Sequence, residues 1–195
     1  MHGLINRSLQ CFISEIYSEA EWEKIAADAG VGFTNFEALM VYDDHLTTDV
    51  IDAACARLEK PQEDFLEDLG TFLCTDKKLD VVRRLLRFGG DSFTDFLFSL
   101  DDLADRVRLA LPELEIPKIE ITVNTAENIT MRCRSEFSGF GHVLVGIIQS
   151  MADDYGTLAL FQHVGREGDA ELVSIHLLSA SHTEGRDFVL ALRAS

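Results

Sequence analysis

The sequence predicts an α+β fold, in which a helical N-terminal subdomain packs on a subdomain made of a four-stranded antiparallel sheet and further helices. Residues 1 to about 112 carry apolar side chains at the three-to-four-residue spacing of amphipathic helices. From residue 118 to about 180, strand-like alternation predicts a hairpin, an apolar helix and a second hairpin. That order is typical of an antiparallel sheet covered by helices. We expect a single domain over 1–195, with the helical part at 1–60 and the α+β part at 61–195.

The N-terminal segments predict three helices joined by loops. The first runs through GLINRSLQCFISEIY, with its apolar residues on or near one face. Ser18 can cap the second helix, because a serine side chain accepts a hydrogen bond from a free amide at a helix start, and Gly30 closes it. Trp22 in this helix is expected to be a core anchor. Thr47 or Thr48 is expected to cap the third helix.

Three more helical segments precede the first hairpin. Pro61 suits the first turn of PQEDFLEDLGTFL, where its missing N–H is not needed. The next segment, DKKLDVVRRLLRFGG, ends in two glycines, and Asp91 or Ser92 can start the one after it. The stretch FLFSLDDLADRVRLALPEL, residues 96–114, predicts one amphipathic helix. Ala104 lies on the shoulder of its apolar stripe and presents only a methyl group to the interior.

The C-terminal half predicts the strands. PKIEITVNTAENITMRCRS is typical of a hairpin with NTAEN as its turn, and GHVLVGIIQSMADDYG is typical of a strongly apolar helix. TLALFQHV and ELVSIHLLS, joined through GREGDA, predict the second hairpin. The tail, residues 181–195, contains the apolar run FVLAL, which we expect to pack on the fold rather than to cover a partner's surface.

Charge and hydropathy narrow the classes of function. The chain carries 17 basic and 34 acidic side chains, and its net charge of −17 repels nucleic acid and anionic lipid. We therefore expect no nucleic-acid partner and no membrane partner. No apolar run approaches the ~20 residues that span a bilayer, and the start MHGLINRSLQ lacks the pattern of a signal peptide. These features favour the cytoplasm.

The sequence contains no motif for metal or catalytic chemistry. Its four cysteines and six histidines show no zinc-ligand spacing, so we expect no metal site and reduced cysteines. GFGHVLVG has glycines between a strand and a helix, but not at the spacing of a dinucleotide-binding loop. Neither a GxSxG elbow nor a phosphate-binding P-loop occurs. Because no nucleophile, base and orienting group can be assembled, we do not expect an enzyme.

Three segments carry a resemblance to a known family. They are MHGLINRSLQCFISEIYSEAEWEKIAADAG, LRFGGDSFTDFLFSLDDL and ITMRCRSEFSGFGHVLVGIIQSMADDYG. Together, and in this order over nearly the whole chain, they resemble the H-NOX family, also called haem NO-binding (HNOB) domains. The resemblance implies a helical N-terminal subdomain set against a larger subdomain with a four-stranded antiparallel sheet, and haem between them. It also implies signalling partners such as a histidine kinase or a cyclic-di-GMP enzyme.

The sequence departs from that family at the positions that would hold haem. The resemblance places an iron-binding histidine at Ala104, whose methyl group has no lone pair for iron. It places a Tyr-x-Ser-x-Arg motif for the haem propionates at Cys133, Ser135 and Phe137, where only the serine remains. Two carboxylates need a cationic, hydrogen-bonding clamp, so ordinary haem binding is not expected. If haem is bound, His142 or Cys133 is the candidate substitute ligand.

Apolar side chains are expected to line the pocket instead. The candidate lining residues are Leu4, Ile5, Cys74, Phe93, Phe96, Leu97, Leu100, Leu103, Pro117, Phe140 and Leu144. Two interpretations stay open: aromatic side chains close the space, or an apolar small molecule occupies it. We expect a stand-alone sensory or regulatory protein without normal haem ligation. The alternative is a haem-based sensor of NO or O2 with an unusual axial ligand, which regulates a histidine kinase or a cyclic-di-GMP enzyme.

Overall fold

The computed structural model describes residues 1–76, 79, 86, 90–110, 114 and 116–178. Its helices are α1 (Gly3–Ile16), α2 (Glu19–Asp28), α3 (Asp44–Leu58), α4 (Gln62–Thr75), α6 (Phe93–Ser99), α7 (Leu103–Ala110) and α8 (Phe140–Asp154). Its strands are β1 (Lys118–Val123), β2 (Asn128–Arg134), β3 (Ala159–Glu167) and β4 (Ala170–Leu177).

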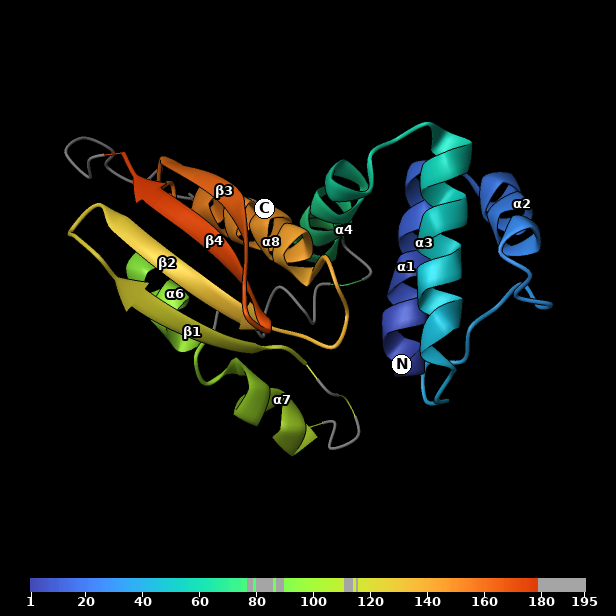
Figure 1. Ribbon diagram of the computed structural model, residues 1–195, viewed down its shortest axis with the longest axis horizontal. Coiled ribbons are helices and arrows are strands. Elements are labelled where there is room, and N and C mark those ends of the chain that lie inside the picture. The colour runs from blue at the N-terminus through green and yellow to red at the C-terminus, as the bar shows by residue number, and fades with distance from the viewer. Residues whose placement is uncertain (77–78, 80–85, 87–89, 111–113, 115, 179–195) are drawn as a thin grey trace, which may run out of the picture.

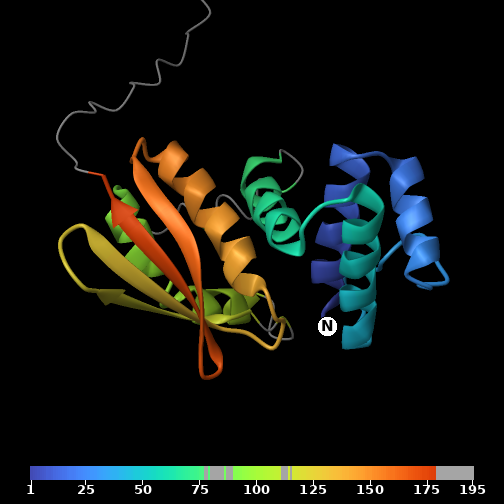
Figure 2. The ribbon, with the colours of Figure 1, turned by 45° about the horizontal axis from the view of Figure 1, so that its top comes forward.

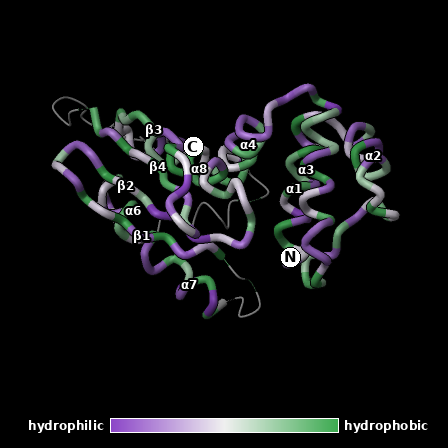
Figure 3. Tube along the Cα trace, in the orientation of Figure 1, coloured by the Kyte–Doolittle hydropathy of each residue, from purple (hydrophilic) through white to green (hydrophobic). Residues whose placement is uncertain are grey.

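The elements gather at two ends of the molecule. Helices α1, α2 and α3 form one end, and the sheet with α6, α7 and α8 forms the other (Figure 1). Helix α4 lies between them and packs against α8, as a second view also shows (Figure 2). Hydrophobic and hydrophilic residues alternate along the helices (Figure 3), as expected where one helix face is buried. The α+β class is therefore confirmed, whereas the subdomain boundary at residue 60 stays a prediction.

The first two helices begin and end as the sequence predicts, and the third does not. The Ser18 hydroxyl accepts the Glu21 amide at 3.2 Å, and the fully buried Trp22 donates its indole N–H to a loop carbonyl. The expectation that Thr47 or Thr48 caps the third helix is wrong, because α3 already begins at Asp44. Thr47 lies one turn inside the helix, where its buried hydroxyl donates to Asn6 Oδ1 at 2.6 Å.

The single helix predicted over 96–114 is divided in two. Ser92 caps α6, which ends at Ser99, and α7 starts only at Leu103. Between them the hydrogen bonds tighten to three-residue turns, and the Arg106 guanidinium donates to the Ser99 carbonyl at 2.8 Å. The break contains two consecutive aspartates, a residue type that favours helix starts over helix interiors. Residues 111–113 of this stretch, most of the helix predicted at 76–90 and the tail at 181–195 lie outside the described residues.

The sheet is antiparallel with the strand order β1-β2-β4-β3, so both predicted hairpins are confirmed. One face is buried and carries a row that runs from Ile121 through Met131 and Val173 to His163. Helix α8 packs against β3 and β4. An irregularity in β3 between His163 and Gly165 shifts the register there, which is typical of a β-bulge.

Aromatic side chains fill the core between α6, α8 and β3. The ring centroids of Phe93 and Phe96 lie 5.8 Å apart, and Phe161 lies 6.0 Å from Phe93. Tyr155 stacks on Phe96 at 5.9 Å. Offset and edge contacts at these distances are favourable beyond the area that they bury. These phenylalanines therefore hold α6 against the helix and the sheet.

Two glycines bring α4 and α8 into backbone contact. A Cβ built on Gly70 would lie 2.0 Å from the Val143 carbonyl oxygen, and one built on Gly146 would lie 2.0 Å from the Glu67 carbonyl oxygen. Real Cβ atoms essentially never approach other heavy atoms so closely. The crossing therefore depends on the absence of a side chain at both positions.

Candidate functional site

A cavity of about 730 Å³ lies between α1, α3, α4 and the segment that joins β2 to α8. Its walls are mainly apolar and include Ile5, Leu69, Leu73, Pro117, Phe140 and Val143. Cavities of a few hundred to a thousand Å³ with mostly apolar walls are typical of small-molecule sites. The fold thus leaves a space of ligand size where its two ends meet.

The predicted lining residues divide between this cavity and the core. Ile5, Pro117 and Phe140 line the cavity. The remaining predicted residues do not line it: Cys74, Phe93, Phe96, Leu97, Leu100 and Leu144 are buried in the core, and Leu4 and Leu103 are partly buried. The apolar face of α6 turns toward the aromatic cluster, which takes Phe93 and Phe96 away from the cavity.

Two positions of the family's haem site are also outside the cavity wall as far as the structure describes it. Ala104, on α7, is partly buried and offers no donor atom. Cys133 lies on the buried face of β2 opposite Glu171, with 1 % of its surface exposed. Burial, and next the nearby Glu171 carboxylate, raise the pKa of the Cys133 thiol to about 12. The thiol is therefore protonated at neutral pH, and it lies outside the cavity wall.

The two remaining family positions do line the cavity. The Ser135 hydroxyl accepts the backbone N–H of Phe137 at 3.0 Å, and the Phe137 ring forms part of the wall where the resemblance places an arginine. Arg134 also reaches the wall, but its Nη1 donates to Glu120 Oε1 at 2.6 Å and its Nε lies 3.3 Å from Asp169 Oδ2. Hydrogen bonding to Arg134 and Lys118 lowers the pKa of Glu120, so the carboxylate stays charged. This guanidinium is already paired within the protein.

Haem does not fit the donor groups of this cavity. The His142 imidazole lies outside the wall, with Nδ1 3.1 Å from Glu67 Oε1. The His2 imidazole lines the wall, but its Nδ1 accepts the Leu4 amide at 3.1 Å, so the neutral ring carries its hydrogen on Nε2. Ligation through Nε2 would move that hydrogen to Nδ1 and remove the cap of α1. Among the described wall residues, no imidazole or thiolate is free to bind iron.

A row of ionisable side chains, which sequence reasoning missed, stands behind the cavity wall: Glu171 is buried, His142 and His163 are partly buried, and the Glu67 side chain is 38 % exposed. Glu171 Oε1 accepts the Gly139 amide at 2.7 Å, and its Oε2 accepts the Gly141 amide at 2.8 Å. His163 Nε2 lies 3.3 Å from Glu171 Oε2 without forming a hydrogen bond to it. The imidazole rings of His163 and His142 lie 4.1 Å apart, centroid to centroid. We name these four residues, Glu67, His142, His163 and Glu171, the histidine row.

Burial has the largest effect on the pKa of His163 in the histidine row. Burial, and next the neighbouring His142, lower the pKa of His163, which outweighs the opposite influence of Glu171. The only signal in the sequence was an acidic residue at an inward position of a strand that is otherwise apolar on that side, in ELVSIHLL. The two histidines lie 21 positions apart on different elements, so no spacing rule could bring them together.

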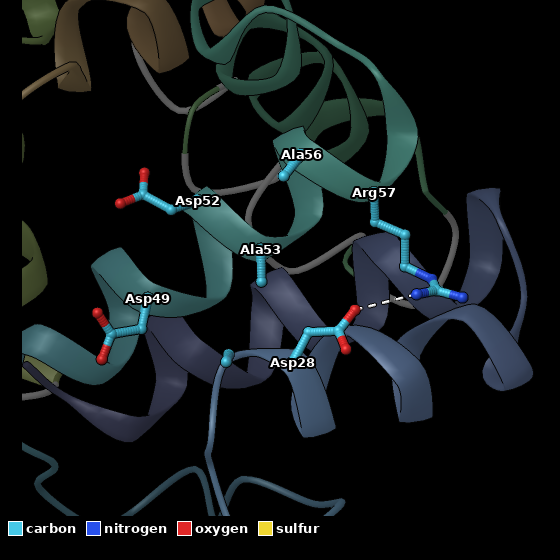
Figure 4. A pocket seen from close by; sticks show the side chains of 7 residues that line it. Asp28, Asp49, Asp52, Ala53, Ala56 and Arg57 are labelled. Carbon is cyan, nitrogen blue, oxygen red and sulfur yellow. Dashed lines mark hydrogen bonds and ion pairs between the residues drawn. The ribbon is translucent and has the colours of Figure 1, made fainter.

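A second hollow of about 570 Å³ lies between α2 and α3 on the outside of the molecule (Figure 4). It is lined by alanines, by Asp28, Asp49 and Asp52, and by Arg57. Arg57 donates to Asp28 at 3.0 Å and to Glu21 at 2.9 Å, so its charge is compensated within the protein. Figure 4 shows the carboxylates of Asp49 and Asp52 apart from that pair. The hollow is an acidic surface feature.

The described ranges contain no metal-binding cluster and no membrane-spanning helix. No group of three or more histidine, cysteine, aspartate or glutamate side chains there is arranged to hold a metal ion. No helix of the described residues has the length and the apolar run needed to span a bilayer. No disulfide bond joins Cys11, Cys55, Cys74 and Cys133 to one another in the described part of the chain.

Comparison with known proteins identifies relatives over most of the chain. The sequence is 25 % identical to soluble guanylate cyclase gcy-31 of Caenorhabditis elegans over 189 residues, which are 96 % of this chain and 27 % of that protein. It is 22 % identical to soluble guanylate cyclase 89Db of Drosophila melanogaster over 164 residues, which are 84 % of this chain and 24 % of that protein. The chain therefore spans about a quarter of the length of these relatives.

Solved structures show the same fold. The H-NOX protein of S. oneidensis in its Fe(II)NO state superposes with a TM-score of 0.77 at 17 % identity, covering 92 % of this chain and 100 % of that one. The Fe(II) unliganded H-NOX protein of K. algicida superposes with a TM-score of 0.77 at 16 % identity, covering 94 % and 100 %. The sequence profile of the HNOB family, described as haem-NO-binding, matches residues 2–163. The chain therefore belongs to the haem-NO-binding family and has the H-NOX fold.

Proposed function

We propose that this chain is a sensory or regulatory domain that binds an apolar small molecule in the cavity between its two ends, without iron ligation by its own side chains. The cavity carries the proposal: its volume suits a small molecule, and Phe137 lies in its wall, at a position to which the resemblance assigns a propionate-binding arginine. An apolar ring there favours an uncharged ligand surface and disfavours a buried carboxylate. Cys133 is buried outside the cavity wall and Ala104 offers only a methyl group, which supports the absence of an iron ligand at these two positions.

The domain would act through a signalling partner. Its family and its relatives named as guanylate cyclases support a nucleotide cyclase as that partner, and the family resemblance also supports a histidine kinase or a cyclic-di-GMP enzyme. Because the cavity wall contains α1 and the start of α8, a ligand would contact both ends of the fold at once. Occupancy could then change how the two ends are arranged, which a partner can detect.

A haem-based sensor with an unusual axial ligand is the second candidate. The observation in its favour is that Met1 and His2 line the cavity; His2 would bind iron only by giving up its hydrogen bond from the Leu4 amide. Thioether and imidazole groups both bind haem iron in other proteins. His2→Ala removes the imidazole, so a haemin complex that depends on His2 would be lost in this variant.

Two titrations test the proposal. N-phenyl-1-naphthylamine, an uncharged apolar fluorophore, should bind with one-to-one stoichiometry, and haemin should produce no sharp absorbance band of ligated iron. Leu69→Trp, which fills the cavity, should abolish dye binding. The matched control Leu160→Trp, on the exposed side of β3, should leave dye binding unchanged. A one-to-one haemin complex that is lost in His2→Ala would favour the second candidate, and absence of dye binding would refute the first.

A further inference from the structure

The histidine row connects two walls of the cavity. The Glu171 carboxylate accepts hydrogen bonds from the amides of Gly139 and Gly141. The residue between these glycines, Phe140, lines the cavity. At the other end of the row, His142 contacts Glu67 of α4, two positions before the wall residue Leu69. The row therefore spans from the first turn of α8 to the helix that faces it.

Space around the row leaves little room for adjustment. A Cβ on Gly141 would lie 2.6 Å from Glu171 Oε2 and 2.6 Å from His163 Cδ2. The carboxylate and the imidazole therefore pack closely against the backbone at the start of α8. The Glu171 side chain is only 6 % exposed, and its charge is stabilised by the two amides at the positive end of the helix dipole. Displacement of the imidazole or of the carboxylate is therefore transmitted to the backbone that positions Phe140.

We propose that protonation of the His142–His163 pair regulates the cavity: with at most one imidazole charged the row holds the wall in place, and with both charged it releases the wall and lowers ligand affinity. This proposal rests on the proposed function. The groups that face the pair are Glu67 from α4, Glu171 from β4 and, beside Glu171, the protonated Cys133 thiol from β2.

Two effects act in the same direction when both rings are charged. Positive charges whose rings lie 4.1 Å apart repel each other, and the repulsion exceeds thermal energy even at high dielectric. The same repulsion drives the charged His163 toward Glu171, where it competes with the hydrogen bonds from Gly139 and Gly141. Both effects move the first turn of α8, and with it Phe140 and Val143 in the wall.

The test measures affinity for N-phenyl-1-naphthylamine at pH 8 and at pH 5.5, because this dye does not change charge in that range. We expect the dissociation constant of the unmodified chain to rise about fivefold or more on acidification. His142→Gln and His163→Gln should each reduce the change to less than about twofold, because only one imidazole is left to charge. His176→Gln removes an imidazole bonded to Asn128 outside the histidine row, and should behave as the unmodified chain.

His2 lines the cavity in the unmodified chain and in all three variants. Any effect of His2 on dye affinity is therefore common to the four proteins, and the differences between their dissociation constants report on the His142–His163 pair. An equal loss of affinity in His142→Gln and in the unmodified chain would overturn the proposal. If the dye does not bind at pH 8, the proposed function fails, and the row is tested without ligand by NMR. The NMR chemical shifts of the Gly139 and Gly141 amide protons should then change with pH, at the midpoint of imidazole protonation, and should stay constant in His142→Gln. Constant chemical shifts in the unmodified chain would refute the release of the wall.

Discussion

Alanine at Gly146 should destabilise the protein through the crossing of α4 and α8. The added Cβ would lie 2.0 Å from the Glu67 carbonyl oxygen and 2.8 Å from the Thr71 nitrogen, whereas an ordinary contact is 3.4 Å or more. Both neighbours are backbone atoms of a helix, so relief requires the helices to separate by roughly 1 Å, and close-packed interiors resist that. Overpacking of this kind costs ~1–3 kcal/mol. Because both short contacts are with backbone atoms, we expect the upper part of that range, ~2–3 kcal/mol. Alanine's better helix propensity returns only ~1 kcal/mol.

The net expectation is a loss of about 1–2 kcal/mol in the free energy of unfolding, measured by urea denaturation. Gly70→Ala should cost a similar amount, because its Cβ would lie 2.0 Å from the Val143 carbonyl oxygen. The double variant should lose less than the sum, since helices that have already separated accommodate the second methyl group more easily. Unchanged or increased stability of Gly146→Ala would refute the backbone contact at this crossing.

Three further outcomes follow from individual residues. Because the pKa of His163 is lowered, this imidazole takes up a proton less readily in the folded state than in the unfolded chain. The contribution of His163 to the free energy of unfolding should therefore be constant above about pH 6.5 and should decline below that value. The decline should be smaller in His163→Gln. A pH-independent unfolding midpoint between pH 7 and pH 5 would contradict this. With its pKa near 12, Cys133 should react with iodoacetamide at pH 8 about a thousandfold more slowly in the folded protein than in urea, as peptide mass spectrometry can show; comparable rates would mean that the thiol is not buried. Leu100→Ala, at a core position with 1 % exposure, should cost ~2–5 kcal/mol in a urea melt, and a loss below about 0.5 kcal/mol would show that this turn is not packed as described.

Local rules predicted most of the fold. Ser18 and Ser92 cap the helices that follow them, and the alternation in both hairpins matches the observed strands. The same rules failed where tertiary contacts determine where a helix begins or breaks. Thr47 has good capping chemistry, but it is used inside α3 to bond Asn6, and the apolar stripe over residues 96–114 did not reveal the break that Arg106 stabilises at Ser99.

The site was less predictable than the fold. The sequence identified Ile5, Pro117 and Phe140 as neighbours of a pocket, but it also placed Phe93 and Phe96 there. Whether an apolar face meets a cavity or a core depends on the orientation of a whole helix, and the orientation of α6 is set by rings on α8 and β3. The histidine row depends on four separate elements meeting behind the cavity wall.

An absorbance titration of the purified chain with haemin, performed beside Ala104→His/Phe137→Arg, tests most directly whether the protein ligates iron. Phe137→Arg places a cation in the cavity wall, and Ala104→His adds an imidazole at the position to which the resemblance assigns the iron-binding histidine. We expect the unmodified chain to show only the broad spectrum of unligated haemin, and the double variant to show increased uptake. A saturable one-to-one complex of the unmodified chain, with the sharp band of ligated iron, would contradict the central claim.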